Sequence, residues 1–185
     1  MKKLLLVTAI TILRFATVNA QDVDFGVKGG LNFASIIGAN TTKNDEVTAF
    51  NFGAMAEIKF SEKFSFQPEL MYSGQGNSNS LDPNSDLVEL NYLNIPLMAK
   101  YYATKGLSLE AGPQIGFLLT AKEDGNDIID SYKNTDFGVN FGIGYKLDNG
   151  LNFSARYNWG LSNITVKNDI TKNNSVFQLS VGYFF

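Results

Sequence analysis

Residues 137–159 read FGVNFGIGYKLDNGLNFSARYNW, and this stretch decides the fold. On both sides of Asp148-Asn149-Gly150, apolar residues alternate one by one with glycine or polar residues. Alternation with period two is typical of β-strands that have two unlike faces, and Asp-Asn-Gly is a strong turn signal. The stretch therefore predicts two antiparallel strands joined by a tight hairpin, with one apolar face and one small, polar face.

The same alternation recurs along the chain from Phe25 to Phe185. It predicts eight strands, within residues 25–33, 50–60, 64–73, 93–102, 107–117, 137–146, 151–159 and 177–185. Runs of this length allow a tilted strand to cross a bilayer. After the first twenty residues no apolar run has the length of a membrane helix, so we expect any membrane crossing to use strands.

Short and long connections alternate between these strands. The short ones are residues 61–63, 103–106 and 148–150. The long ones are polar and cover residues 36–47, 74–86, 120–135 and 162–174. Outer-membrane barrels have short periplasmic turns and long surface loops, so this alternation is typical of them. With eight strands, both chain ends should lie at the periplasmic rim.

The direction of the apolar face has to be inferred, because soluble lipocalin-type barrels alternate in the same way. The polar face carries Gly26, Gly30, Gly53, Gly112, Gly116, Gly138, Gly142, Gly144 and Gly182. A solvated surface has no need of glycine, whereas a narrow lumen needs small residues. Aromatic residues also gather toward the ends of the apolar faces, as in interfacial girdles. We therefore predict an all-β, eight-stranded antiparallel transmembrane β-barrel with its apolar face toward lipid.

Three prolines fall within the predicted strands, at Pro68, Pro96 and Pro113. Proline cannot donate a hydrogen bond to the strand ladder and is found mainly at edges or bulges. A closed barrel has no edge. We therefore expect local bulges at these prolines.

The first twenty residues are expected to form a cleaved secretory signal peptide. A basic start is followed by a short apolar run, and Val18-Asn19-Ala20 places small residues where a signal peptidase cuts. The barrel domain is then residues 21–185, exported to the outer membrane. Losing Lys2, Lys3 and Arg14 with the signal takes the formal net charge from -3 to -6, which disfavours nucleic-acid binding.

Five sequence blocks resemble a known family. They are FSFQPELMYSGQG (64–76), YLNIPLMAKY (92–101), LEAGPQIGF (109–117), ARYNWGL (155–161) and VGYFF (181–185). Together they resemble the small PorT-like, or "outer membrane protein beta-barrel", family of Bacteroidetes-type bacteria. The resemblance implies an integral outer-membrane barrel that tolerates the three prolines, but it implies no substrate. The family's best-known type serves a secretion and gliding apparatus, and most members are called porin-like on fold alone.

The chain end resembles the signal by which barrel-assembly machinery recognises its clients. That signal would comprise Phe177, Leu179, Val181, Tyr183 and Phe185. Barrel-assembly machinery and outer-membrane lipid are therefore expected partners of the chain.

Chemistry-bearing motifs are sparse. The chain has no cysteine and no histidine, so it lacks a thiolate zinc site and the usual general base of small barrel enzymes. A carboxylate-only enzyme could use Glu57, Glu69 or Glu110, but these residues are better explained as ion-pair partners in the lumen. The acidic residues of the third long loop match no EF-hand spacing: Glu123, Asp124, Asp127 and Asp130. We expect no catalytic, cofactor or metal site.

Eight charged residues should point into the lumen: Lys28, Glu57, Lys59, Glu69, Lys100, Glu110, Lys146 and Arg156. All fall in the periplasmic half of their strands or near the midplane, and the loop-side halves offer mainly Gly, Asn, Ser and Gln. Because unpaired buried charges are costly, these side chains should pair across the lumen, and six of them should build a polar plug that closes it: Glu57, Glu69, Glu110, Lys28, Lys100 and Arg156. Arg156 is the expected hub, since its guanidinium can hold two carboxylates.

The expected function follows from the narrow lumen. Eight strands leave barely enough room for side chains, whereas wide pores use about sixteen or more. We expect a structural or interaction protein that binds a protein partner through its surface loops or periplasmic rim. A small porin-like channel is the first alternative, and a carboxylate-based enzyme is the second.

Overall fold

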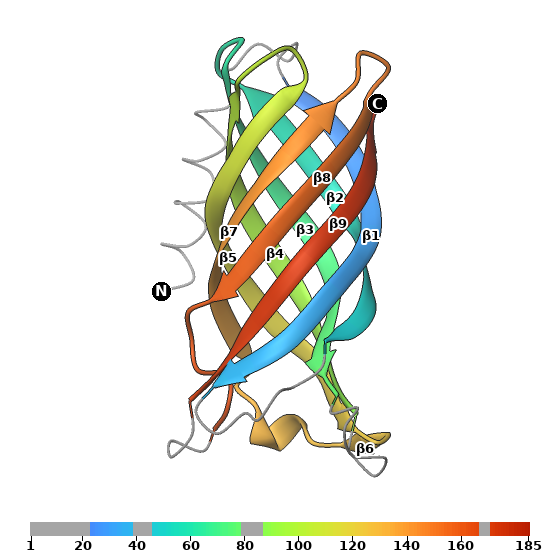
Figure 1. The fold of residues 1–185 in the computed structure, drawn as a ribbon, viewed down its shortest axis with the longest axis vertical. Coiled ribbons are helices and arrows are strands. Elements are labelled where there is room, and N and C mark those ends of the chain that lie inside the picture. The colour runs from blue at the N-terminus through green and yellow to red at the C-terminus, as the bar shows by residue number, and fades with distance from the viewer. Residues whose placement is uncertain (1–22, 39–45, 79–86, 167–170) are drawn as a thin grey trace, which may run out of the picture.

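The computed structural model describes residues 23–38, 46–78, 87–166 and 171–185. It is a closed antiparallel barrel of eight long strands (Figure 1), which confirms the predicted fold class. The eight strands are β1 (Val23–Gly38), β2 (Val47–Lys59), β3 (Phe64–Asn77), β4 (Val88–Tyr102), β5 (Leu107–Glu123), β7 (Thr135–Lys146), β8 (Leu151–Gly160) and β9 (Lys172–Phe184). Between β5 and β7 lie the short elements β6 (Asn126–Asp127) and η1 (Ile129–Ser131). No helix in the described part of the chain has the length and apolar character to span a membrane.

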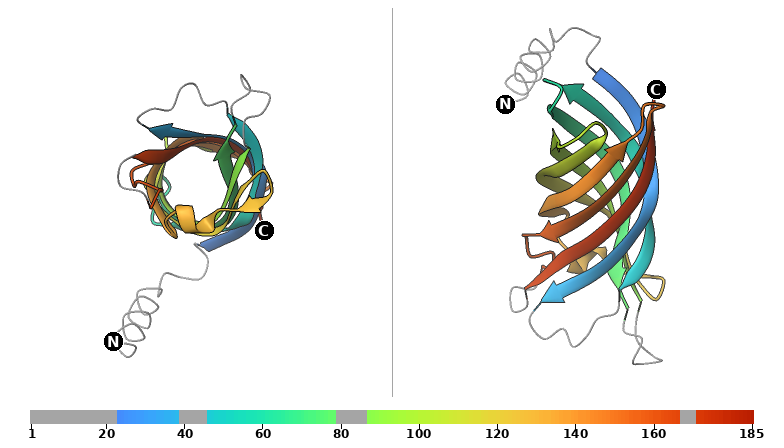
Figure 2. Two further views of the ribbon diagram at one scale, coloured as in Figure 1. Left: turned by 90° about the horizontal axis from the view of Figure 1, so that it is seen from below. Right: turned by 45° about the horizontal axis from the view of Figure 1, so that its top comes forward.

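The ring closes by simple neighbour pairing. Each long strand pairs with the long strands before and after it in the chain, and β1 pairs with β9. Figure 2 shows the resulting ring, seen along the barrel. The order around it is β1, β2, β3, β4, β5, β7, β8, β9. Strands four places apart in this order therefore face each other across the lumen.

One rim holds all the short turns. The tight connections are residues 60–63, 103–106 and 147–150. Val23 at the start of β1 and Phe184 at the end of β9 lie at the same rim, and the other ends of the strands lie at the opposite rim together with β6 and η1 (Figure 1). Gly106 and Gly150 have φ angles of +92° and +89°, a left-handed backbone that glycine adopts without strain. The predicted alternation of turns and loops is confirmed.

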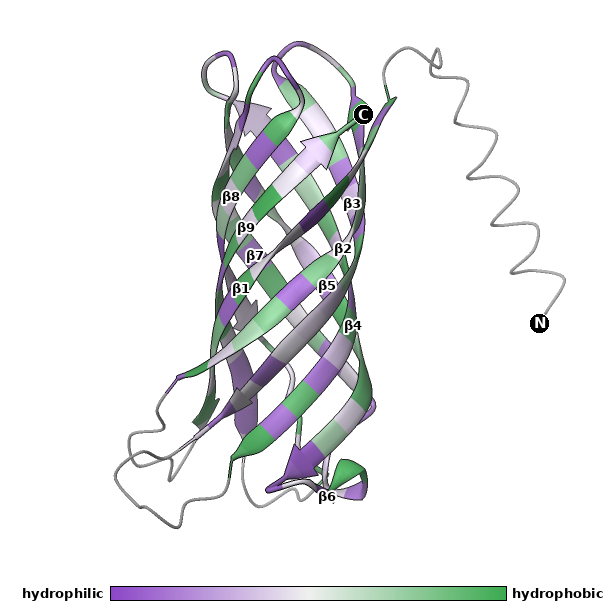
Figure 3. Cartoon of the chain, turned by 90° about the vertical axis from the view of Figure 1, so that its right-hand side faces the viewer, coloured by the Kyte–Doolittle hydropathy of each residue, from purple (hydrophilic) through white to green (hydrophobic). Residues whose placement is uncertain are grey.

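The two faces of the wall differ as predicted. Apolar and polar residues alternate along the strands (Figure 3). On the outer face, Phe50 and Phe25 are 72% and 61% exposed, whereas Asn32 and Glu57 on the inner face are 0% exposed. An outer surface this apolar is suited to lipid, and the polar groups are turned inward.

The strands are longer at the loop rim than the sequence predicted. β1 continues to Gly38, β3 to Asn77 and β5 to Glu123, and β9 begins at Lys172. The predicted boundaries were wrong because these ends are polar or mixed in composition and do not continue the strict alternation, so most of them were assigned to loops. In the barrel each has a ladder partner, such as Gly38 opposite Lys172, so strand pairing overrides the local polar composition.

The prediction of bulges at the prolines was also wrong. Pro68 pairs with Leu97, Pro96 with Gln114 and Pro113 with Val139. The strands keep one register on both sides of Pro68 and Pro96, so neither proline inserts an extra residue into the ladder. Two neighbouring residues beside each proline make no regular ladder pair. A register shift occurs instead between Asn91 and Tyr92, where β4 pairs with β5. A proline removes one donor, and the pairs above and below it are enough to hold the strands in register.

Candidate functional site

Charged side chains fill the barrel interior toward the short-turn rim. Seven of the eight predicted lumen charges form one connected set of ion pairs: Lys28, Glu57, Glu69, Lys100, Glu110, Lys146 and Arg156. Period-two alternation places all of them on the inner face, where six are 5% exposed or less and the Lys146 side chain is 15% exposed. This set is called the lumen network below.

Arg156 on β8 lies between two carboxylates. Its Nη1 is 2.8 Å from Glu69 Oε1, and its Nη2 is 2.7 Å from Glu110 Oε2. Its Nε also donates to Glu110 Oε2 at 2.8 Å. On the paired strand β7, Gly142 leaves the room for this side chain, because a Cβ there would lie 2.6 Å from Arg156 Cγ. The planar guanidinium therefore makes a forked contact with one carboxylate and a single contact with the other.

Two buried lysines extend the network. Lys28 Nζ is 2.9 Å from Glu69 Oε2. Lys100 Nζ lies 3.4 Å from Glu110 Oε1 and 3.6 Å from Glu57 Oε1, and it donates to Gln67 Oε1 at 2.9 Å. Every carboxylate in this buried part thus faces more than one positive charge, which is the condition under which buried ions persist.

The network ends at the short-turn rim. Lys146 Nζ lies 2.9 Å from Glu57 Oε2 and 2.6 Å from Asp24 Oδ2, and Lys59 Nζ lies 2.8 Å from the same Asp24 oxygen. The Lys59 side chain is 44% exposed. Lys59 was expected in the lumen but lies at its mouth, because it is the last residue of β2. It joins the lumen network only through Asp24.

Sequence reasoning missed several members of this site. Asp24 precedes the run that was read as the first strand, but it shares the even-numbered inner face of Lys28 and could have been found by extending that face by one step. Tyr102 and Ser65 both donate to Glu57 Oε1. Gln67 donates to Glu69 at 2.6 Å. Neutral polar residues of the inner face therefore complete the hydrogen bonding of the carboxylates.

The ion pairs cross the full width of the barrel. Glu57 lies on β2 and Lys146 on β7, four places apart around the ring. Glu69 on β3 and Arg156 on β8 are also four places apart. Both ion pairs therefore join opposite walls of the barrel.

A neutral polar layer lies between the lumen network and the loop rim. Asn32 Nδ2 donates to Ser73 Oγ at 2.9 Å, and Asn51 Nδ2 donates to Asn32 Oδ1 at 2.9 Å. Ser180 and Gln178 donate to these asparagines from β9. This layer contains the side-chain types that the sequence predicted for the loop-side half.

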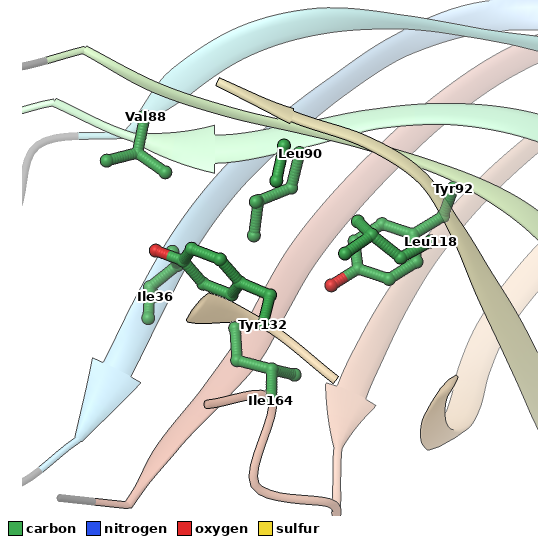
Figure 4. Packing of buried hydrophobic residues seen from close by; sticks show 8 residues of the cluster. Ile36, Val88, Leu90, Tyr92, Leu118, Tyr132 and Ile164 are labelled. Atoms are coloured by element: carbon green, nitrogen blue, oxygen red, sulfur yellow. The ribbon is translucent and has the colours of Figure 1, made fainter. Parts of the chain in front are cut away.

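At the loop rim itself the interior is apolar, which the sequence prediction missed. The cluster comprises Ile36, Val88, Leu90, Tyr92, Leu118, Ala121, Tyr132 and Ile164 (Figure 4). Ile128 and Ile129, next to and within η1, pack against it. We call this set the loop-end cluster. The prediction failed because Ile36 and Ile164 lie in segments that were assigned to loops, and Leu90 lies before residue 93, where its strand was expected to begin.

Asp136 is a buried carboxylate that stands apart from the lumen network. It accepts hydrogen bonds from Ser162 Oγ at 2.7 Å and Asn174 Nδ2 at 2.8 Å. Within the described residues it is the one buried carboxylate with no basic group within 4 Å. Its inner-face position was visible in the sequence, but the strand was expected to begin only at Phe137.

The acidic residues of the third long connection serve the local backbone. Asp124 Oδ1 accepts a hydrogen bond from the Leu87 amide at 3.0 Å, and Asp127 Oδ1 accepts one from the Ile129 amide at 3.0 Å. In the described part of the chain no three acidic, histidine or cysteine side chains converge on a common point. Asp127 therefore holds the backbone at the start of η1, and Asp124 ties this connection to the residue before β4.

The five residues of the expected assembly signal share the outer face of the last strand. They are Phe177, Leu179, Val181, Tyr183 and Phe185. All are at least 42% exposed, and the rings of Tyr183 and Phe185 lie 6.3 Å apart. They form a continuous apolar stripe that ends at the short-turn rim.

The chain was compared with known proteins. The sequence profile of the family described as "Outer membrane protein beta-barrel domain" matches residues 19–166. The fold is similar to the crystal structure of Neisserial surface protein A, NspA, with a TM-score of 0.60, 13% identity, and coverage of 87% of this chain and 97% of that one. It is also similar to Ail, the attachment invasion locus protein of Yersinia pestis, with a TM-score of 0.54, 15% identity, and coverage of 89% and 99%.

A third similar structure is OprG from Pseudomonas aeruginosa, with a TM-score of 0.50, 15% identity, and coverage of 88% of this chain and 95% of that one. At these identities the likeness shows the fold alone. A comparison with curated protein sequences gives no match.

Proposed function

Because this chain belongs to the outer membrane protein beta-barrel domain family, we propose that it is a sealed outer-membrane barrel that acts through contacts of its surface loops or periplasmic rim. In this proposal it neither conducts solutes nor catalyses a reaction. The barrel anchors and positions the binding segments, and the closed lumen preserves the permeability barrier.

The proposal rests on one observation: two ion pairs, Glu57–Lys146 and Glu69–Arg156, join opposite strands of the barrel. An ion passing through would have to displace these side chains and leave buried charges unpaired, which costs several kcal/mol. At the other end of the lumen, the side chains of the loop-end cluster are apolar except for the hydroxyls of Tyr92 and Tyr132, so they offer little to replace the hydration of a passing ion. The lumen thus has an ionic closure and an apolar closure in series.

The same contacts argue against a carboxylate-based enzyme. Glu57, Glu69 and Glu110 are each 4% exposed or less, and each faces at least one basic side chain. A general acid or base has to reach a substrate within hydrogen-bond distance. Side chains that are buried and already paired are better explained as the structure of the closed lumen.

The loops suggest the charge of a partner. Ail has been described in complex with the heparin analogue sucrose octasulfate, a polyanion. Here the four long connections, residues 36–47, 74–86, 120–135 and 162–174, carry nine carboxylates against five lysines. This balance disfavours a polyanion and favours a protein surface with positive charge.

Conductance in a planar bilayer tests the closed lumen. The refolded barrel should give no unitary current steps, while a wide porin inserted into the same membrane reports that the assay works. Reproducible steps from the wild-type chain that scale with salt concentration would support the porin-like alternative and overturn the sealed barrel.

A second experiment separates the two contact regions. Residues 124–131 would be replaced by a Gly-Ser segment of equal length, and in a matched variant residues 103–105 at the periplasmic rim would be replaced in the same way. Cross-linking in intact cells should give a product with the partner protein for the wild-type barrel. That product should be absent in only one of the two variants. If both variants keep every cross-linked product, the contact role of these segments is wrong.

A further inference from the structure

The outer wall of the barrel contains a groove over five neighbouring strands, β5, β7, β8, β9 and β1. It has a volume of about 460 Å³, within the range of small-molecule sites, about 300–1,000 Å³. The five strands lie side by side in the ring (Figure 1). The groove lies outside the lumen, because its walls are made of outward-pointing apolar side chains.

Two adjacent rows of the strand ladder form the walls. One row consists of Leu107, Tyr145, Phe153 and Val181, each paired with the next. The other consists of Ile143, Ala155, Leu179 and Leu31, paired in the same way. Between the rows the wall consists of Gly144, Ser154, Ser180 and Gly30, whose small or absent side chains belong to the inner face.

Small residues deepen the groove at two points. Ala155 interrupts the second row between Ile143 and Leu179. Gly29 follows Val181 at the end of the first row. The result is a linear, apolar channel, open along its length to the membrane, whose shape fits an extended alkyl chain.

The groove has a direction with respect to the membrane. Leu107 is the first residue of β5 and Tyr145 is one residue before the end of β7, so this end lies at the short-turn rim. At the other end Gly29 lies six residues beyond the start of β1. The groove therefore leads from the periplasmic interface into the hydrocarbon layer, which is the path of an acyl chain in the periplasmic leaflet.

An exposed ion pair stands at the short-turn rim, beyond the interfacial end of the groove, and its two residues also line the mouth of the lumen. Lys105 Nζ lies 3.1 Å from Asp148 Oδ2, and the two side chains are 84% and 82% exposed. They belong to the turns that flank the paired residues Leu107 and Tyr145. An ammonium group has three donors and a carboxylate has several acceptor positions, so each partner keeps free capacity while the pair is made.

We propose that this groove is a binding site for a zwitterionic phospholipid that carries a primary ammonium, namely phosphatidylethanolamine. One acyl chain lies between the two ladder rows, the phosphate accepts from Lys105, and the ammonium donates to Asp148. Tyr145, an aromatic residue at the membrane interface, packs beside the glycerol region.

Native mass spectrometry of the refolded barrel, released from detergent with added lipid, tests the site. The probes are phosphatidylethanolamine, phosphatidylglycerol and phosphatidylcholine of identical acyl chains. The wild-type barrel should retain one phosphatidylethanolamine. Ala155→Leu should lower the lipid-bound fraction about tenfold, because the new side chain occupies the space of the alkyl chain.

Matched variants keep the test decisive. Ala56→Leu makes the same change on the outer face of β2, away from the groove, and should bind as the wild type does. Gly29→Leu is a second blocking variant, because a Cβ there meets only ordinary contacts, at 3.4 and 3.7 Å. Asp148→Ala should abolish the preference for phosphatidylethanolamine over phosphatidylglycerol.

The proposal is overturned by either of two results. Equal retention of the three lipids by the wild-type barrel would show that the ion pair selects no headgroup. Undiminished retention by folded Ala155→Leu and Gly29→Leu barrels would show that the acyl chain lies elsewhere.

Discussion

Replacing Arg156 with alanine is the most direct perturbation of the lumen network. The change removes a buried guanidinium whose nitrogens lie 2.8 Å from Glu69 and 2.7 Å from Glu110. Both carboxylates would keep one lysine each, Lys28 at 2.9 Å and Lys100 at 3.4 Å. These two lysines would not balance the buried negative charge, because Lys100 also faces Glu57.

The expected magnitude follows from this arrangement. Breaking a buried ion pair by removing one partner costs about 3–5 kcal/mol. Since two carboxylates are affected and each retains a partial substitute, we expect Arg156→Ala to lower the free energy of unfolding by about 3 kcal/mol. Arg156→Lys keeps the charge but not the fork, and should cost about 2 kcal/mol.

Urea titration of the barrel refolded into lipid vesicles measures these values. Trp159, the single tryptophan, is 59% exposed on the outer face and reports the change from lipid to water. Heat-modifiable mobility on gels gives an independent count of folded barrels. Lys105→Ala, which breaks the exposed pair with Asp148, is the matched control and should change stability by less than about 1 kcal/mol.

A double-mutant cycle then isolates the interaction between Arg156 and Glu110. Glu110→Gln in the Arg156→Ala background removes one of the stranded carboxylates, so the double variant should be more stable than the sum of the single effects by about 2 kcal/mol. If Arg156→Ala stays within about 0.5 kcal/mol of wild type, the charges are separately hydrated and the reasoning fails.

Four further outcomes are expected. A cysteine at Asp127 should react with an impermeant reagent on intact cells and one at Glu62 should not; equal labelling would refute the orientation. Deleting Phe185 should lower the amount of heat-modifiable barrel in the outer membrane, and an unchanged yield would leave the terminal stripe with only a lipid-facing role. Asp136→Asn should raise the free energy of unfolding by about 1 kcal/mol or more, since it neutralises an unpaired buried charge; a loss of stability in urea would show that the charge is needed. Burial, and secondarily the Glu123 carboxylate, raises the pKa of Tyr132 above its ordinary value of 10.0, so the folded loop-end cluster holds that proton more tightly than the unfolded chain. The stability of the cluster should therefore fall as the pH rises above about 10, as seen by proteolysis of residues 124–131, and Tyr132→Phe should abolish this dependence.

The positions of the paired charges, but not their partners, could be predicted from the sequence. Lys28, Glu69 and Arg156 could be placed on the inner face because a strand alternates strictly, and their heights followed from counting residues to the nearest turn. Which charges meet could not be predicted in this way. Glu57 faces Lys146 and not its chain neighbour Lys59, because contact across a ring depends on the tilt and stagger of all eight strands.

Residues at the strand ends were the least predictable. Asp24, Asp136 and Ile36 all belong to the inner face, yet they stand where alternation fades into polar or mixed sequence. A short window cannot distinguish such an end from a loop. The hydrogen bonds of a neighbouring strand decide it, as at Ile36, which pairs with Asn174 on β9.

The amino-acid sequence by itself determined the barrel, the number of its long strands, the rim that carries the turns, and the inward or outward direction of nearly every strand residue. These properties follow from local rules, since side chains of a strand alternate and glycine-rich turns reverse the chain. Only the tertiary structure decided the partners of Arg156, the apolar cluster around Tyr92 and Ile164, and the groove beside Ala155. Each of these depends on residues from three or more strands, whose relative heights are set by ring closure and not by any local segment.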